Sequence, residues 1–227
     1  MIISQILNYI RPNYKKTYSQ MGEDLIVKNY FSSIKNFSPS YIDIGAFDPF
    51  SLSNTALLYE SGSRGINIEP NPLQYKRFLK HRSKDTNLNI GIGPKEGKLD
   101  YYRMSSPVLN TFSKEQAEEC EQKWGIKILD IIPIDVKPFT WVFQNYFNGK
   151  FPDFLSMDIE GLEDKLIDEM KTFPSLPAVI CIETLSFAMD TSGTKKDSLL
   201  NTLVGLNYKI YADTHLNTIL VNAHHRG

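Results

Sequence analysis

The sequence predicts an α/β protein with one mostly parallel sheet of seven strands, helices on both faces and an antiparallel hairpin at the C-terminal end. Short apolar segments alternate with helix-length segments along most of the chain. The segment Tyr41-Ile-Asp-Ile-Gly45 ends in a glycine, and Gly65-Ile-Asn-Ile-Glu69, one helix-length later, ends in an acid. In doubly wound α/β proteins this pattern forms a nucleoside-binding cleft at the carboxyl ends of the strands.

The predicted strands are short and rich in Ile, Leu, Val, Phe and Tyr, which is typical of buried strands. They cover residues 41–45, 65–69, 87–92, 153–158, 178–183, 206–212 and 217–222. The predicted helices between them cover residues 53–62, 71–83, 138–147, 162–171 and 195–205. Asp213-Thr-His-Leu216 is too short for a crossover helix, so the last two strands are expected to form an antiparallel hairpin.

Two regions lie outside this alternation. Residues 1–35 are predicted to form an N-terminal helical cap over one edge of the sheet or the mouth of the cleft, with a turn at 19–24 leading into a helix at 23–32. Residues 97–136 are predicted to be an insertion that shapes the acceptor pocket, with a strand at 98–103, a helix at 113–123 and a strand at 126–136. No linker marks a boundary, so residues 1–227 are expected to form a single domain.

Composition and charge exclude several classes of function. The chain has 227 residues, 41% of them hydrophobic and 22% charged, which is ordinary for a globular protein. A formal net charge of -1 gives no electrostatic basis for binding nucleic acid. No apolar run approaches the roughly 18 residues of a membrane span, and the first residues carry no basic leader. Cys120 and Cys181 are expected to be reduced thiols, so a cytoplasmic location is predicted.

The ends of the first two strands supply the first candidate binding residues. Gly45 lets the backbone approach a ligand, and Glu69 can accept hydrogen bonds from both hydroxyls of a ribose. Together with their neighbours Asp43, Ala46 and Pro70, these residues favour an adenosine-containing cofactor. The alternative is that Gly45 only closes a strand, as glycine does in many α/β proteins.

Six sequence segments carry a further signal by their order along the chain. They are Ser19-Gln-Met-Gly-Glu-Asp24, Tyr41-Ile-Asp-Ile-Gly-Ala-Phe-Asp-Pro49, Ser53-Asn-Thr55, Arg64-Gly-Ile-Asn-Ile-Glu-Pro-Asn71, Met157-Asp-Ile-Glu-Gly-Leu-Glu163 and Asn217-Thr-Ile-Leu-Val221. With these segments the chain resembles the FkbM-type methyltransferases. The resemblance implies a class I methyltransferase fold, which is a Rossmann-like sheet, with S-adenosylmethionine as the cofactor and hydroxyl groups of sugars or natural products as acceptors. Many relatives have Asn and a further Gly in the first loop, where this chain has Phe47 and Pro49.

The resemblance also implies further contacts with the cofactor, each with a plainer alternative. Ser53 and Asn54 open the first helix beside the expected methionine carboxylate, although either residue can simply be an N-cap. Asn89 and Gly91, at the end of the third predicted strand, would face the adenine, or else form a turn. Gln20 would lie at the mouth of the site, or else in a loop without a role.

The acidic residues near the ends of the fourth and fifth predicted strands are the catalytic candidates. Asp158 is the first choice for a base that removes the proton from an acceptor hydroxyl, and Glu160 and Glu183 follow it. A second interpretation is that Asp158 and Glu183 bind Mg²⁺, which would polarise the acceptor. Glu163 is interpreted as a solvated residue in the first turn of a helix.

The predicted function is O-methylation of a sugar, a glycan or a glycosylated small molecule. Two other classes stay open at this stage. A nicotinamide-dependent oxidoreductase would use a similar cleft, but it would need a fuller Gly-x-Gly-x-x-Gly loop. A non-catalytic binding module would keep the fold without the reaction, because a fold alone does not establish an activity.

Overall fold

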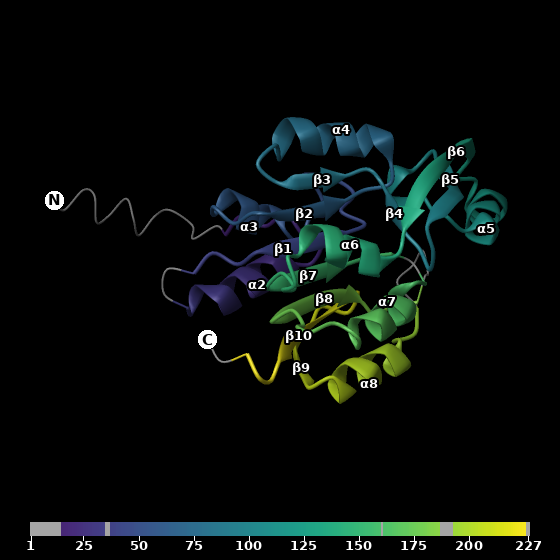
Figure 1. Ribbon diagram of the computed structural model, residues 1–227. Helices are drawn as coiled ribbons and strands as arrows, with labels where there is room; N and C mark the ends of the chain where they lie inside the picture. Colours follow the sequence, from purple (N-terminus) through teal and green to yellow (C-terminus); the bar gives the residue numbers. More distant parts are fainter. Residues whose placement is uncertain (1–14, 35–36, 160, 187–192, 226–227) are drawn as a thin grey trace, which may run out of the picture.

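The structure is a computed structural model that describes residues 15–34, 37–159, 161–186 and 193–225 (Figure 1). Its main element is a seven-stranded sheet with the order β3-β2-β1-β7-β8-β10-β9. The strands β3, β2, β1, β7 and β8 run parallel, whereas β10 is antiparallel to both β8 and β9. The predicted parallel sheet with an antiparallel C-terminal hairpin is therefore confirmed. Its strands are β1 (Tyr41–Ile44), β2 (Gly65–Ile68), β3 (Thr86–Leu88), β7 (Phe154–Met157), β8 (Val179–Glu183), β9 (Tyr208–Asp213) and β10 (Asn217–Asn222).

Helices cover both faces of the main sheet. The core on one face joins Ile42 and Ile44 of β1 to residues of α6, α7 and α8. The core on the other face joins Tyr41 of β1 to Val27 of α2 and Leu58 of α3. Side chains alternate along a strand, so Asp43 faces the same side as Tyr41. These helices are α2 (Glu23–Ser32), α3 (Ala56–Glu60), α4 (Pro72–His81), α6 (Phe139–Tyr146), α7 (Glu163–Met170) and α8 (Asp197–Gly205).

The predicted strand 87–92 is wrong, because the chain changes sheets within it. β3 ends at Leu88 in the main sheet, and β4 (Gly91–Ile92) belongs to a second sheet of order β4-β6-β5. Between them, the Asn89 side chain donates to the backbone oxygens of Glu69 and Pro70 at 2.9 and 2.8 Å. This anchor fixes the polar turn at which the two strands separate.

The insertion folds as the rest of the second sheet. β5 (Gly97–Met104) and β6 (Ile128–Lys137) pair in antiparallel fashion, and α5 (Lys114–Trp124) packs on them, with a short helix η1 (Pro107–Leu109) between. The predicted strand, helix and strand are confirmed. However, β6 also pairs with β4 at Gly91 and Ile92, so the unit begins before residue 97.

The N-terminal part confirms the predicted helix at 23–32, which is α2, while the helices expected before residue 15 lie outside the described residues. Both cysteines are buried free thiols. No helix in the described part of the chain is both long and apolar enough to span a membrane.

Candidate active site

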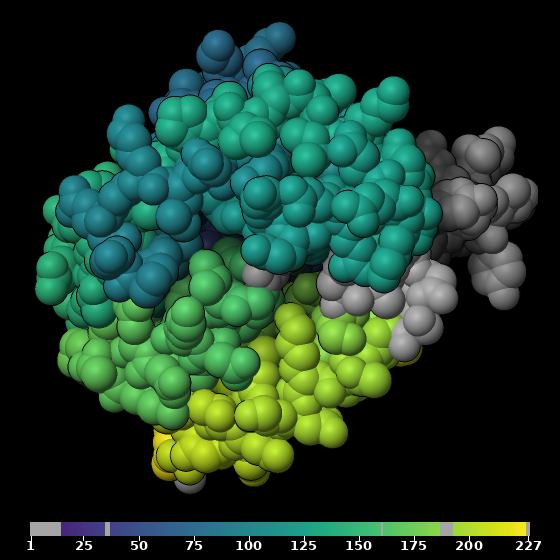
Figure 2. Space-filling model, turned by 90° about the vertical axis from the view of Figure 1, so that its right-hand side faces the viewer, coloured from purple at the N-terminus to yellow at the C-terminus, as the bar shows by residue number. Residues whose placement is uncertain are grey.

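The carboxyl ends of four parallel strands meet at one edge of the main sheet. Ile44 of β1 is in register with Ile68 of β2 and Met157 of β7, and Met157 is in register with Ile182 of β8. The residues that follow are therefore brought together as predicted: Gly45, Glu69, Asp158 and Glu183. Figure 2 views this edge and shows a hollow between the teal residues of the insertion and the green residues of α7. This hollow is the candidate active site.

Gly45 is required by the contact between two loops of this edge. Its φ is +76°, and a Cβ atom at this position would lie 2.0 Å from the backbone oxygen of Asp158. The Asp158 N–H donates to the oxygen of Ile44 at 3.0 Å, and the Gly45 and Ala46 N–H groups donate to the oxygen of Ile68 at 3.0 and 3.1 Å. The glycine thus lets the loops after β1 and β7 pack backbone against backbone, which the sequence pattern did not reveal.

Glu69 closes the loop after β1 onto the loop after β2. Its Oε2 accepts from the Phe47 N–H at 2.8 Å, and its Oε1 accepts from the Asn71 N–H at 2.7 Å. Burial, with smaller contributions from the charges of Asp43 and Asp48, raises the pKa of Glu69 to about 8. Each carboxylate oxygen has two lone pairs, so both oxygens can still accept a ribose hydroxyl.

Asp43 lies beneath the cleft and is only 4% exposed. Its Oδ2 accepts from the Thr55 hydroxyl at 2.7 Å. Burial raises the pKa of the Asp43 carboxyl, and the hydrogen bonds from Thr55 and Ser156 oppose that effect. Asp43 therefore lies at the cleft, where its buried carboxyl forms part of the floor.

The helix α3 is shorter than the predicted helix at 53–62, because it covers only five residues. The Ser53 hydroxyl accepts from the Ala56 N–H at 3.2 Å, so this side chain serves the start of the helix. The Asn54 side chain donates to the Ser156 hydroxyl at 3.3 Å. For Ser53, the structure therefore favours the capping interpretation, whereas half-buried Asn54 stays beside the strand ends.

Asp158 combines solvent contact with an enclosed position. Its side chain is exposed by surface area, yet it follows β7 at the sheet edge among protein atoms that disfavour its charge. This enclosure is the main reason that the pKa of Asp158 is raised to about 6; the charge of Glu163 raises it further, and the charge of Lys196 lowers it. A carboxylate with these properties can exchange a proton with a ligand near neutral pH.

The interpretation of Glu163 as a solvated residue is wrong. Glu163 is 2% exposed, because its Oε1 forms an ion pair with the Lys196 Nζ at 3.2 Å and its Oε2 accepts from the Gly161 N–H at 2.9 Å. The Lys196 Nζ also lies 4.0 Å from the Oε2 of Glu183. The sequence placed Lys196 in a predicted helix and gave no signal for this role, because the ion pairs join helices and a strand that are distant in sequence.

A divalent metal does not fit this cluster. The described residues contain no group of three or more His, Cys, Asp or Glu side chains that could hold a metal ion. In addition, the Lys196 ammonium already lies beside Glu163 and Glu183, so a Mg²⁺ at Asp158 and Glu183 would meet a like charge.

The other predicted site residues lie as follows. Gln20 is exposed, and Glu160 lies outside the described residues. Gly91 is buried in β4, where a Cβ atom would lie 2.6 Å from the Phe112 ring, so packing within the second sheet explains this glycine. Pro70 and Asn89 are half-buried and are joined by the hydrogen bond from the Asn89 side chain to the Pro70 oxygen at 2.8 Å.

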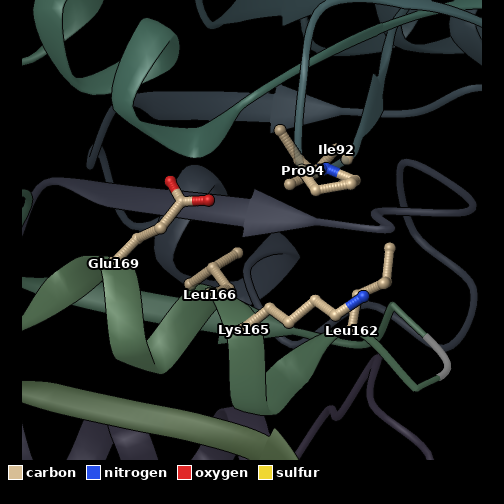
Figure 3. Close-up of a pocket in the computed structure, with 7 residues that line it drawn as sticks. Ile92, Pro94, Leu162, Lys165, Leu166 and Glu169 are labelled. Atoms are coloured by element: carbon tan, nitrogen blue, oxygen red, sulfur yellow. The ribbon is translucent and has the colours of Figure 1, made fainter.

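A smaller apolar hollow adjoins the main one. Figure 3 shows Leu162 and Leu166 of the α7 region facing Ile92 and Pro94 across it. Gly93, Lys165 and Glu169 complete its lining. It marks where α7 meets the second sheet.

The turn predicted at residues 19–24 connects the N-terminal part to the cleft edge. The Oε1 of Glu23 accepts from the Thr214 hydroxyl at 2.7 Å and from the Asn217 amide at 3.0 Å. The Asp24 carboxylate accepts from the Tyr18 N–H at 2.7 Å. Both acids of the motif are therefore structural: Glu23 attaches the turn to the hairpin of β9 and β10, and Asp24 holds the residues just before the turn.

A comparison with protein families identifies the chain. The Methyltransferase FkbM domain matches residues 43–210, which is more than half of the sequence. The chain belongs to the FkbM methyltransferase family. The matched range includes the four strand ends that form the hollow, from Asp43 to Glu183. Family and topology support an S-adenosylmethionine-dependent methyltransferase.

Solved structures with similar chains include several that are named methyltransferases, although the sequences are distant. A TehB-like SAM-dependent methyltransferase from Corynebacterium glutamicum has 6% identity and a TM-score of 0.44, with 97% of this chain and 94% of that chain covered. A putative O-methyltransferase from Klebsiella pneumoniae has 8% identity and a TM-score of 0.46, with 98% and 88% covered. Aeropyrum pernix fibrillarin, in complex with S-adenosyl-L-methionine, has 10% identity and a TM-score of 0.41, with 93% and 83% covered. A comparison with curated proteins found no match.

Proposed function

We propose that this FkbM methyltransferase transfers the methyl group of S-adenosylmethionine to a hydroxyl oxygen of a sugar, a glycan or a glycosylated small molecule. The observation that carries the proposal is the position of Asp158. It directly follows β7 at the edge where the strand ends meet, its side chain is exposed, and the pKa of its carboxyl is raised to about 6. An acceptor hydroxyl bound in the hollow would meet this carboxylate.

Asp158 acts as the base in the proposed reaction. A neutral sugar hydroxyl is a poor nucleophile, and a carboxylate with a pKa near the working pH can take its proton as the new bond forms. The bound cofactor supplies a methyl group on a positively charged sulfur. The acceptor oxygen gains the methyl group, the C–S bond breaks with its electron pair left on sulfur, and the hydroxyl proton moves to Asp158. The products are a methyl ether and S-adenosylhomocysteine.

The other residues of the edge hold and align the reactants. Glu69 offers two carboxylate oxygens to the ribose, and the loop of Gly45 and Ala46 lies between Glu69 and Asp158. Alignment of the acceptor oxygen, the methyl carbon and the sulfur supplies much of the rate increase in such a displacement. Lys196 forms an ion pair with Glu163, and its positive charge limits the rise of the Asp158 pKa.

The acceptor class rests on charge and on the position of the insertion. A net charge of -1 provides no basic surface for a polyanion, which agrees with a neutral acceptor such as a sugar. The insertion borders the hollow in Figure 2, where it can contact the acceptor. In this proposal the enzyme acts in the cytoplasm, where S-adenosylmethionine is available.

The test is a methylation assay with a panel of mono- and oligosaccharides, read by mass spectrometry of the products. We expect a product heavier by one methylene group, with the methyl on oxygen, in the wild type and in the control Asp164→Asn, which changes an exposed acid of α7. Asp158→Asn should lose most of this activity. EDTA should leave the wild-type rate unchanged.

Three results would contradict the proposal. Methylation of nitrogen or carbon alone would mean that the acceptor group is not a hydroxyl. Binding of S-adenosylmethionine without transfer to any acceptor in the panel would favour a binding module. Loss of activity in EDTA with recovery in Mg²⁺ would restore the metal interpretation of Asp158 and Glu183.

A further inference from the structure

A second polar cluster lies beneath the cleft and is fully enclosed by α3, α4, β1 and β2. Arg82, which caps the C-terminus of α4, is 0% exposed, and so are Tyr41 and Thr55. The Arg82 Nε donates to the Oδ2 of Asp85 at 2.9 Å, its Nη2 donates to the Tyr41 hydroxyl at 2.8 Å, and its Nη1 donates to the Thr55 hydroxyl at 2.9 Å. The Thr55 hydroxyl in turn lies 2.7 Å from the Oδ2 of Asp43. A continuous chain of hydrogen bonds thus connects Arg82 to the cleft floor.

The chemistry of the groups fixes the direction of this chain. A guanidinium has only donors, so the Thr55 oxygen must accept from Arg82. Its single proton then points to Asp43, the nearest acceptor. The Ser53 Oγ lies 3.5 Å from the Thr55 Oγ1, so Ser53 must be the donor between these two hydroxyls. Arg82 therefore orients the Thr55 hydroxyl toward Asp43.

The bond to Thr55 is not needed to compensate the buried charge of Arg82. Asp85 forms the ion pair with Arg82, and its carboxylate also accepts from the Tyr41 hydroxyl at 2.7 Å, the Gly65 N–H at 3.0 Å and the Asn67 amide at 3.0 Å. The charge of the arginine is thus balanced by this acid, and Thr55 accepts from the remaining nitrogen, Nη1. The branch to Thr55 is the one part of the cluster that leads to the site.

Asp43 needs this support because its surroundings disfavour its charge. Burial raises the pKa of the Asp43 carboxyl, and Asp85 raises it further, while Thr55, Arg82 and Ser156 lower it. Three other ionisable groups interact electrostatically with Asp43 from neighbouring strands. They are Glu69 after β2, Asp158 after β7 and Cys181 in β8.

We propose that Arg82 and Thr55 are positioning residues that hold the Asp43 carboxylate ionised and fixed in the floor of the cleft, where its negative charge favours the positively charged S-adenosylmethionine. This inference rests on the proposed function for the identity of the ligand. The hydrogen-bond chain itself belongs to the free protein. It can therefore be tested without the cofactor.

The first test follows the titration of Asp43 in the free protein by carbonyl-detected NMR with ¹³C-labelled aspartate. Thr55→Val keeps the shape of the side chain and removes the hydroxyl, so the midpoint of Asp43 should rise by about one pH unit. Thr55→Ser should restore the wild-type midpoint. The control is Thr218→Val, which removes the buried hydrogen bond to Thr184 at 2.7 Å on the other side of the sheet and should leave Asp43 unchanged.

The second test is calorimetry with S-adenosylmethionine near the wild-type midpoint of Asp43. Thr55→Val should bind about fivefold more weakly there, because a midpoint one pH unit higher lowers the ionised fraction of Asp43 by about that factor. An unchanged Asp43 titration in Thr55→Val, or no recovery in Thr55→Ser, would overturn the proposed chain. If the titration shifts but the wild type does not bind S-adenosylmethionine, then the chain stands and the proposed function, with the cofactor role of Asp43, is wrong.

Discussion

At the scale of single residues, the surroundings of three carboxylates at the cleft give them different roles. Burial raises the pKa of Asp43, Glu69 and Asp158 alike. Glu69 and Asp43 have their oxygens engaged by loop N–H groups and a hydroxyl, so they hold the site together. Asp158 is the one of the three whose side chain is exposed, and this difference selects it as the base.

The pH dependence of the reaction follows from Asp158. A base must be deprotonated, and the pKa of Asp158 is about 6, so kcat/KM should rise tenfold per pH unit below about 6 and level off above it. In Asp158→Asn the rate should fall by roughly 10² to 10⁴ and the acidic limb should disappear. Steady-state kinetics between pH 5 and 9 measures both effects. A variant with wild-type turnover would leave alignment as the main source of catalysis.

The ribose contact is tested at Glu69. At pH 9, where Glu69 is ionised because its pKa is about 8, replacing it with Gln removes the charge and one acceptor, so binding of S-adenosylmethionine should weaken by about 1.5 to 3 kcal/mol. Calorimetry measures the change, with Glu118→Gln on the exposed face of α5 as the control. Unchanged affinity in Glu69→Gln would mean that the ribose is bound elsewhere.

At the scale of elements, the site depends on loops that touch one another. The loop after β1 packs on the loop after β7 at Gly45, and Lys196, just before α8, pairs with Glu163 at the start of α7. Both contacts join segments that are more than 30 residues apart. The geometry of Asp158 is therefore set by its neighbours in space.

Gly45→Ala should destabilise the protein by roughly 2 to 5 kcal/mol, from backbone strain at positive φ and from the contact with the Asp158 oxygen. Denaturant unfolding measures the loss. Gly62→Ala is the matched control, since its φ is +103° but nothing lies within 4 Å of the added Cβ atom, so it should show the strain alone. Equal losses in the two variants would show that the loops after β1 and β7 can separate without cost.

Lys196→Met should move the acidic limb of the activity profile to a higher pH. The Lys196 charge lowers the pKa of Asp158, and its removal also leaves Glu163 unpaired nearby, so the midpoint should rise by about one pH unit above its value near 6. Lys195→Met is the control, because Lys195 pairs instead with Asp213 at 2.9 Å. A shift of equal size in both variants would point to a general loss of positive charge.

At the scale of the whole molecule, the cleft lies along one edge of a sheet whose helices pack on both faces. A ligand that binds only the folded protein at 100 times its Kd adds about 2.7 kcal/mol of stability. For a protein of 227 residues this corresponds to a rise in Tm of about 5 to 10 °C. S-adenosylmethionine and S-adenosylhomocysteine should produce this shift in a thermal unfolding assay, whereas NAD should not. A rise in Tm with NAD alone would instead support a nicotinamide-dependent oxidoreductase.

The sequence by itself determined the main sheet, the C-terminal hairpin and the acids at the strand ends. Strands of three to six residues, most of them apolar, and the short turn at 213–216 are local features. Parallel strands place their carboxyl ends at one edge of the sheet whatever the details of packing. The tertiary structure decided the rest. Glu163 is buried because Lys196 faces it, Gly45 is required because Asp158 lies against it, and the segment 87–92 divides because β6 is there to pair with Gly91 and Ile92. Each of these outcomes depends on which distant segments meet, and no local pattern contains that information.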